Sequence, residues 1–543
     1  MKIASKKIAA MLLAGTASFA LASAAQAGGK HGSDGTSAAS ANGDAQQAKI
    51  QALEEEIQAL SDQVQDLKRS TSDQYADAQT QQAAAVKVTI PNGRPTFSSA
   101  DGKFTASIRA LGQFDWGYFS QPATAAGFPA AYGPDLSSGA NFRRGYLGVQ
   151  GKVFGDWSYN INYDFGGSGG TEDQGRIQSL YVEYDGLAPF AVRIGAYPAP
   201  ANLEDGVGAA DTIFLERNSA SDSARSIAAG DGRDAVSLLY TGDKFFAALS
   251  YTGGKIKDGL GTFDEQNAIV GRLSDIVYSD NDFKLLLSAS GTDVFKPADN
   301  SAGPGSKQNV SISAVPELTV DSAGYFSQSS ATSVPTTTSA AKLVNTGNID
   351  AAHVYQWAAE SAVAWKSLYG QGGYYKYYID RRTGSLPNPD FTGWYAQAAW
   401  VLTGEGRAYN PLTGAFGSPK PASPFDLSGG GIGAWELAAR YSDLDLNYNQ
   451  GAVGSATPSG GVRGGEQKIW TAGINWYPNS VIKFAFDYEH INVSRIIGGA
   501  TAVAGAGTPP ATFTVYPQIS DAQANQSANQ AIDAVAIRAQ ISL

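Results

Sequence analysis

The chain has 543 residues, a charged fraction of 16%, a formal net charge of −11 and 63 glycines. The negative charge argues against nucleic-acid binding, and a composition rich in Gly and aromatic residues but poor in charge is more typical of a β protein than of a soluble helical enzyme. The chain contains no cysteine, which excludes thiol nucleophiles and disulfides and is compatible with passage through an oxidising periplasm.

The first 27 residues predict a secretory signal peptide, with cleavage at their end. Lys2, Lys6 and Lys7 form a positively charged start, the apolar run 8–21 follows, and Ala25-Gln26-Ala27 supplies the small-residue cleavage site. No other stretch reaches the ~18 consecutive apolar residues that a transmembrane helix needs. The mature chain is therefore predicted to be either soluble or a β-barrel.

Residues 46–72 predict a periplasmic coiled coil between polar linkers at 28–45 and 73–100. Apolar residues recur at the alternating three- and four-residue spacing of a heptad seam, namely Ile50, Leu53, Ile57, Leu60, Val64 and Leu67. An amphipathic helix packed on a core is the alternative, which the flanking polar linkers disfavour. β-Branched residues alternating with Leu along a seam favour dimers, but about three heptads do not set the oligomeric state of a whole protein.

From residue 101 the pattern changes to period two, and residues 101–543 predict an all-β transmembrane barrel of sixteen antiparallel strands. In the first strand Ile108 and Trp116 take one face, and Arg109 and Asp115 take the other. This alternation suits a wall with lipid outside and a polar lumen inside. The predicted strands are 104–119, 142–154, 157–166, 175–186, 190–200, 233–241, 244–256, 267–279, 282–295, 354–369, 371–382, 391–404, 432–447, 467–477, 481–494 and 531–543.

The predicted connections alternate between short and long, as expected when short turns face the periplasm and long loops face outward. The short turns include 155–156, 186–189, 242–243, 279–282, 370–372 and 478–480, and the long loops include 120–141, 201–232, 296–353, 448–466 and 495–530. The connection 405–431 is an exception, because it is long but falls on the short-turn side. An even number of strands places both ends of the barrel in the periplasm.

Several motifs resemble the phosphate-selective porin O/P family. Phe142-Arg-Arg-Gly-Tyr-Leu-Gly-Val-Gln-Gly151 and then Trp157-Ser-Tyr-Asn-Ile-Asn-Tyr-Asp-Phe165 resemble its second and third strands. Further similar segments are Phe214–Arg217, Leu402–Glu405 with Tyr409, and Gly433–Leu446, so that the resemblance covers roughly residues 86–543.

This resemblance implies a sixteen-stranded trimeric porin of the bacterial outer membrane, with loops folded into the lumen as a constriction. It also implies that the long turn 405–431 tucks inward. The family name implies anion selectivity, often for phosphate, achieved with a ladder of Arg along the lumen and Lys at the constriction. The third loop of this chain, residues 201–232, is poor in Lys and departs from that pattern.

Alternation assigns a set of basic side chains to the lumen as candidates for lining the pore and contacting anions. They are Arg109, Arg144, Arg193, Arg272, Lys376 and Arg440 on strands, Arg217 and Arg225 in the third loop, and Arg233 at its exit. Lys152, Lys483 and Arg538 belong to the same face. Guanidinium groups pair well with phosphate and carboxylate oxygens, and rings of Arg or Lys give anion selectivity.

Acidic residues are nearly as frequent on this predicted face, so bracing of the wall stands beside solute contact for each basic residue. The acids are Asp115, Glu183, Glu360, Asp380, Glu436, Asp487 and Glu489. Of Arg143 and Arg144, only one is expected to face the lumen, with the other at the rim. Asp443 and Asp445 have the opposite parity to Glu436 and Arg440, so that strand is expected either to carry a bulge or to leave the membrane near Tyr441.

The sequence predicts an outer-membrane porin that lets small hydrophilic solutes diffuse, leaning to anions, with phosphate selectivity as its more specific form. A general non-selective porin and a structural protein tethered to peptidoglycan through the coiled coil are the alternatives. The expected partners are outer-membrane lipid, small anionic or neutral solutes, two further copies in a homotrimer, and peptidoglycan. No enzyme, cofactor or metal site is predicted, because the three histidines, His31, His353 and His490, have no metal-ligand spacing.

Overall fold

The computed structural model describes residues 38–84, 86–121, 136–166, 175–256, 263–301, 303, 305–320, 342–382, 384–496, 527 and 529–543. The predicted signal peptide and the first part of the predicted linker lie outside the described residues. The chain divides into two compact units, Met1–Ala83 and Ala84–Leu543.

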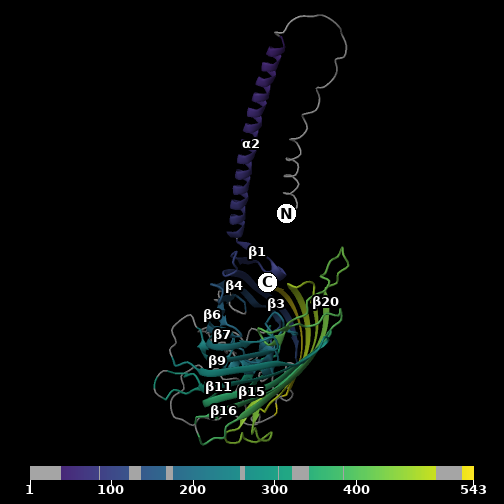
Figure 1. Ribbon diagram of the computed structural model, residues 1–543. Coiled ribbons are helices and arrows are strands. Elements are labelled where there is room, and N and C mark those ends of the chain that lie inside the picture. The colour runs from purple at the N-terminus through teal and green to yellow at the C-terminus, as the bar shows by residue number, and fades with distance from the viewer. Residues whose placement is uncertain are drawn as a thin grey trace, which may run out of the picture. The chain divides into compact units, whose positions relative to one another are not determined.

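The described part of the first unit is a helix, α2, which runs over Ala38–Ala84 (Figure 1). It extends beyond the predicted coiled coil at both ends, because the flanking segments are rich in Ala and Gln, which favour helix even where no apolar seam continues. All six predicted seam residues are exposed, from Leu60 at 53% to Leu67 at 68%. No helix in the described part of the chain is long and apolar enough to span a membrane.

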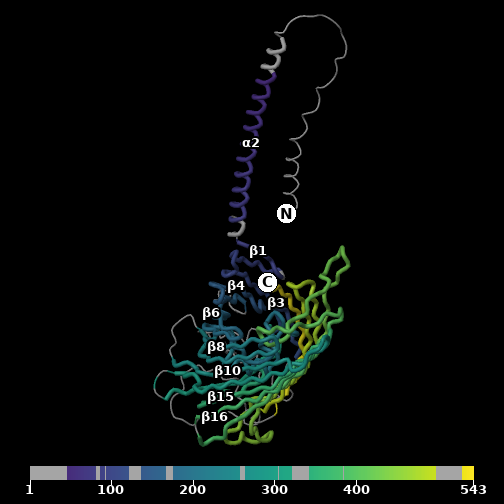
Figure 2. The backbone as a smooth tube through the Cα atoms, in the orientation of Figure 1, coloured from purple at the N-terminus to yellow at the C-terminus, as the bar shows by residue number. Residues whose placement is uncertain are grey.

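The second unit is a barrel of sixteen antiparallel strands, which confirms the predicted fold class (Figures 1 and 2). The barrel strands are β3 Thr105–Ser120, β4 Gly139–Val153, β5 Trp157–Asp164, β6 Arg176–Leu187, β7 Phe190–Ala196, β8 Arg233–Thr241, β9 Phe245–Lys255, β10 Asn267–Ser279, β11 Phe283–Lys296, β15 Ile349–Trp365, β16 Leu368–Arg381, β17 Asp390–Val401, β20 Ala434–Tyr448, β21 Val462–Tyr477, β22 Ile482–Ser494 and β23 Gln530–Ser542. Each predicted strand corresponds to one of these. The barrel closes because β23 pairs with β3, from Asp533 opposite Ser120 to Ser542 opposite Leu111.

Burial alternates along the strands as the sequence pattern requires. On β22, Phe484, Phe486 and Tyr488 are exposed on the outer face, while Asp487 and Glu489 are buried inside. The polar side chains are therefore enclosed and the apolar side chains form the surface, the reverse of a soluble protein and the arrangement that a lipid environment requires.

The predicted linker at 73–100 is largely structured. After α2, short strands β1 Lys87–Thr89 and β2 Thr96–Ser98 flank a single 3-10 turn at Pro91–Gly93, and β2 pairs with β3. The Arg94 guanidinium donates to the main-chain oxygen of Leu543 at 3.0 Å, and the Leu543 amide donates to the Ala110 carbonyl at 2.8 Å. This segment thus lies across the seam where the first and last barrel strands meet.

Two local predictions are corrected. The turn predicted at 370–372 lies inside β16, and the chain instead reverses at Lys366–Ser367, where Lys366 takes a φ of 51°. A lysine therefore occupies the left-handed position of this turn, a conformation that favours glycine. The strand before it, β15, starts and ends about five residues earlier than predicted.

Asp443 and Asp445 face the opposite side of the strand from Glu436, and no bulge between these residues causes this. β20 pairs with β21 in continuous register from Ala434 to Asp445. The two aspartates therefore share the outward face with Trp435 and Tyr441, which supports the strand emerging from the apolar layer near Tyr441.

Small elements fill the connections. They are β12 Asn309–Val310, β13 Ser313–Ala314 and β14 Val344–Asn345 in the loop after β11, and β18 Tyr409–Asn410 and β19 Ala415–Phe416 in the turn after β17. β13 pairs with β14, and β18 pairs with β19.

Candidate functional site

The third loop, residues 201–232, carries two helices whose starts are capped by asparagine. α3 spans Leu203–Gly206, and the Asn202 side chain accepts from the Asp205 amide at 2.8 Å. α4 spans Ser219–Ala228, and the Asn218 side chain accepts from the Ser221 amide at 2.8 Å. Such caps satisfy amide donors that the first helical turn leaves unpaired, so the sequence fixes the local shape of the loop.

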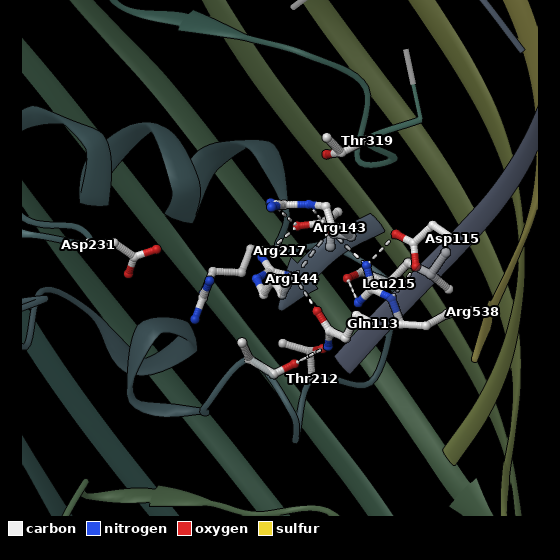
Figure 3. A network of polar contacts seen from close by, with 12 residues as sticks. Gln113, Asp115, Arg143, Arg144, Thr212, Leu215, Arg217, Asp231, Thr319 and Arg538 are labelled. Carbon is white, nitrogen blue, oxygen red and sulfur yellow. Dashed lines mark hydrogen bonds and ion pairs between the residues drawn. The ribbon is translucent and has the colours of Figure 1, made fainter. Parts of the chain in front are cut away.

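Glu216, between the two helices, ties the loop to the barrel wall. Its carboxylate accepts from Arg143 at 2.8 and 3.0 Å, from Arg144 at 3.1 Å and from Arg538 at 2.9 Å. Arg538 also binds Asp115 in a bidentate pair, with both contacts at 2.6 Å. Figure 3 shows the arginines, which come from β4 and β23, converging on this point.

Both Arg143 and Arg144 reach Glu216, which corrects the prediction that only one of them faces inward. The register between β3 and β4 shifts between Gln113 and Phe114, opposite these arginines. An extra residue in one strand interrupts the strict alternation of faces, and both guanidinium groups consequently point into the lumen.

Glu216 is charged across the neutral and mildly acidic range. Burial by itself would raise its pKa, but the guanidinium groups of Arg143, Arg144 and Arg538 outweigh burial and hold the pKa well below its usual value. One carboxylate shared by several cations therefore acts as a permanent electrostatic clasp.

Further contacts hold the third loop against the strands from β15 to β23. The Leu203 and Leu215 amides donate to Glu360 and Asp487, both at 2.7 Å. Lys483 donates to the Thr212 carbonyl at 2.6 Å. Glu360, Asp487 and Lys483 thus face the lumen, as predicted. Their hydrogen bonds, however, are made with the third loop.

A second loop adds a buried ion pair to the same side. Glu317, in the connection after β11, lies 2.6 Å from Arg440 and also accepts from the Ser219 amide at 2.6 Å. The side chains of Arg440 and Glu317 are each 1% exposed. Arg440 is therefore shielded from solutes by its own partners.

The turn 405–431 tucks inward, as the family resemblance implies. Arg272 donates to the Gly414 carbonyl at 2.8 Å, and Ser418 hydrogen-bonds Asp211 of the third loop. Arg407 binds Glu436 at 2.7 Å, and this buried pair anchors the start of the turn to β20. The turn and the third loop thus support each other inside the barrel.

These insertions divide the lumen into a covered side and an accessible side. On β8–β23, almost every inward-facing side chain is buried, among them Arg272, Gln397 and Thr471. On β4–β7 the inward face includes half-buried residues, namely Tyr146, Gln150, Ser158, Gln178, Tyr181, Glu183 and Arg193. These inward-facing side chains therefore remain partly accessible to solvent.

Arg193 is held in place on the accessible wall. Its Nε donates to Glu183 at 2.7 Å, and its guanidinium lies 4.4 Å from the Tyr181 ring centroid and 5.3 Å from that of Tyr197. A cation stacked on aromatic rings and paired with a carboxylate has little freedom to move toward a solute.

A group of charges lies where the third loop returns to the wall. Arg225 binds Asp205 at 2.5 Å and Asp231 at 2.8 Å, and Arg217 lies 3.6 Å from Asp205. Arg176, at the start of β6, donates to Asp164 at 3.3 Å, and its side chain remains 51% exposed. Figure 3 shows Arg217 on the side of the Glu216 clasp that faces Asp231.

The structure places the predicted pore candidates in several different settings. Arg144, Arg217, Arg225, Arg272 and Arg440 contact carboxylates or carbonyls of the inserted loops and turn. Arg193 lies on the accessible wall, Arg109 is half-buried on the inward face of β3, and Arg233 donates to the Gly253 carbonyl at 2.6 Å.

Lys376 does not line the lumen, and the same correction applies to Asp380. Tyr375, Tyr377 and Ile379 are fully buried on the inner face of β16, so the residues between them face outward. Lys376 there forms an ion pair with Asp390. The sequence pattern predicted the wrong face for Lys376 and Asp380 because the inner face of β16 is aromatic rather than polar. This aromatic face packs against α4.

Sequence reasoning missed Glu216, Glu317, Arg407, Asp231, Arg176 and Lys255. Loop residues have no alternation to reveal their direction, and Arg176 and Lys255 stand at strand ends, where the pattern fades. The repeated acids of the third loop were the available signal. Among the described residues, no group of His, Cys, Asp and Glu could hold a metal ion.

Comparisons with known proteins agree with this architecture. The family model for phosphate-selective porin O and P matches residues 124–496, more than half of the chain. Porin O of Pseudomonas aeruginosa is 23% identical over 427 residues, which cover 78% of this chain and 91% of that protein. An uncharacterized protein of Caulobacter vibrioides is 31% identical over 147 residues, covering 27% of this chain and 26% of that protein.

Two solved structures are also similar. In-vitro folded OmpT, an outer membrane protein of Vibrio cholerae, has a TM-score of 0.42 at 11% identity and covers 81% of this chain and 98% of that one. The outer membrane channel DcaP of Acinetobacter baumannii has a TM-score of 0.40 at 10% identity and covers 82% of this chain and 99% of that one.

The closed barrel, its inserted third loop and the family match together identify a bacterial outer-membrane channel rather than an enzyme. The chain belongs to the phosphate-selective porin O and P family.

Proposed function

We propose that this porin lets small hydrophilic solutes diffuse along the β4–β7 wall, with a mild preference for anions. The observation that carries the proposal is the division of the lumen by the third loop, which leaves a group of half-buried polar side chains together on that wall. Gln150, Ser158 and Gln178 offer neutral polar groups there. The exposed cation Arg176 supports the lean to anions.

Tight phosphate selectivity is less well supported than a general preference for anions. A ladder of cations selects phosphate only when its guanidinium groups have donors to offer. Arg144, Arg440 and Arg538 instead bind carboxylates of the chain itself. These three arginines therefore fit the alternative role of bracing the barrel wall better than the role of contacting solutes.

Conductance in planar bilayers tests this function. Purified protein should form open channels, and the zero-current potential in a KCl gradient should show a modest excess of chloride permeability. Phosphate added at micromolar concentration should leave the chloride current largely unchanged. Cation preference would contradict the anion lean, and strong phosphate block would show that the pore is phosphate-selective.

A second role follows from α2. Its seam residues Ile50, Leu53, Ile57, Leu60, Val64 and Leu67 are all exposed in the single chain. Because exposed apolar seams of this spacing bury themselves against partner helices, we propose that α2 associates as a periplasmic coiled coil within a homotrimer and reaches peptidoglycan. Deleting residues 46–72 should reduce co-sedimentation with peptidoglycan while the barrel still conducts; unchanged co-sedimentation would contradict the tether.

A further inference from the structure

We propose that Asp231 determines the ion selectivity of this pore, because its carboxylate is a fixed internal anion that competes with permeating anions for one cluster of cations. This inference rests on the proposed diffusion function and deepens it. The cation cluster is defined as Arg144, Arg176, Arg217, Arg225 and Lys255. The ligand class is a small inorganic anion such as chloride or an oxyanion.

Asp231 lies among these cations at the end of the third loop. It accepts from Arg225 at 2.8 Å and from the Gln178 side chain at 3.2 Å. Burial opposes its ionisation, but Arg225, Arg176, Arg144 and Arg217 hold its pKa below the usual value. The Asp231 side chain keeps 22% of its surface exposed, so its charge also faces water.

The two most accessible members of the cation cluster stand at the ends of two different strands. Arg176 begins β6 and is 51% exposed at its side chain, while Lys255 ends β9 and is also exposed. Lys255 lies within electrostatic range of Asp231, Arg176 and Arg225. Among the described residues, no carboxylate forms an ion pair with Lys255. The cluster therefore presents two exposed cationic side chains, those of Arg176 and Lys255, around the Asp231 carboxylate.

The backbone holds Asp231 in this position. It stands between Gly230 and Gly232, whose φ values are +112° and +65°, conformations that favour glycine. The Gly232 amide donates to the Gln178 carbonyl at 3.0 Å, and a Cβ at Gly232 would lie 2.6 Å from the Ile177 carbonyl oxygen. The loop end is thus seated directly on β6, which fixes the backbone from which the Asp231 carboxylate reaches Arg225 and Gln178.

A fixed carboxylate at this place changes what the cluster attracts. A permeating anion is attracted by the cations and repelled by the carboxylate of Asp231. Even in a water-like medium, a single charge about 6 Å away changes the local concentration of an ion about threefold. Removing that charge while keeping the side-chain volume should therefore favour anions, and removing an exposed cation should do the opposite.

The experiment compares the parent chain with Asp231→Asn and Arg176→Gln, both reconstituted as full-length protein. Folding is first checked by the heat-dependent shift in electrophoretic mobility. In a KCl gradient, Asp231→Asn should raise the chloride-to-potassium permeability ratio about threefold, and Arg176→Gln should lower it about twofold. Asp243→Asn is the matched control: it removes the same charge from an exposed turn at the other end of β8 and should leave the ratio unchanged.

An unchanged or lowered ratio in Asp231→Asn would overturn the inference, as would an equal rise in the Asp243 control. If Asp231→Asn does not fold, Arg176→Gln decides alone, and an unchanged ratio in that variant overturns the inference. Absence of channels in the parent chain would instead remove the proposed function, so the two failures are distinguishable.

Discussion

The two sides of the lumen use the same residue types for different purposes. On the covered side, Arg440 and Arg538 are buried and bind acids of the wall and the inserted loops. On the accessible side, Arg176 keeps half of its side chain exposed. A basic residue that an inserted loop covers is thus a buried brace, whereas Arg176, which none of the described loop residues covers, is paired with Asp164 and still presents its charge to water.

The largest expected effect comes from breaking the Glu216 clasp. Glu216→Gln leaves Arg143, Arg144 and Arg538 without the carboxylate they share, and loss of one partner from a buried ion pair costs about 3–5 kcal/mol. Urea unfolding followed by tryptophan fluorescence should show a fall of this size. Glu466→Gln, which affects a surface pair with Lys468, is the control and should change the free energy of unfolding by less than about 1 kcal/mol.

The same clasp predicts how stability depends on pH. Because the folded state lowers the pKa of Glu216, its contribution is present above the unfolded pKa of about 4.3 and is lost as pH falls through the folded pKa. The difference in unfolding free energy between the parent and Glu216→Gln should be constant from neutral pH down to about pH 5 and shrink at lower pH. A difference that grew on acidification would contradict the assignment.

A smaller effect is expected where the third loop returns to the accessible wall. Gly232→Ala forces a left-handed conformation on alanine, which costs about 1–2 kcal/mol, and it brings a Cβ against the Ile177 carbonyl. The variant should unfold at lower urea and show an altered permeability ratio. Gly208→Ala, whose Cβ would meet nothing closer than 3.7 Å, is the matched control and should leave both unchanged.

The smallest effect is predicted at Lys376. Because this residue faces outward and pairs with Asp390 at the surface, Lys376→Gln should change the free energy of unfolding by less than about 1 kcal/mol. Its permeability ratio should equal that of the parent chain in the same KCl gradient. A clear loss of anion preference would show that Lys376 reaches the pore after all.

The sequence predicted the barrel well because alternation is a property of each strand, independent of what the loops do. It predicted the site less well, since the direction of Glu216, Glu317 and Asp231 depends on loops that have no period. The bulge at Arg143 and Arg144 and the aromatic inner face around Tyr377 show the same limit within strands. Both places contact the third loop, through Glu216 in the first case and Ala220 in the second.

The position of the pore along the β4–β7 wall is the central claim, and cysteine accessibility tests it most directly. The chain has no cysteine of its own, so single variants report cleanly. A cationic thiol reagent should reduce the current through Ser158→Cys and Gln150→Cys, while Thr471→Cys and Gln397→Cys, which are covered by the inserted loops, should be unaffected. Loss of current at Thr471→Cys with none at Ser158→Cys would contradict the account.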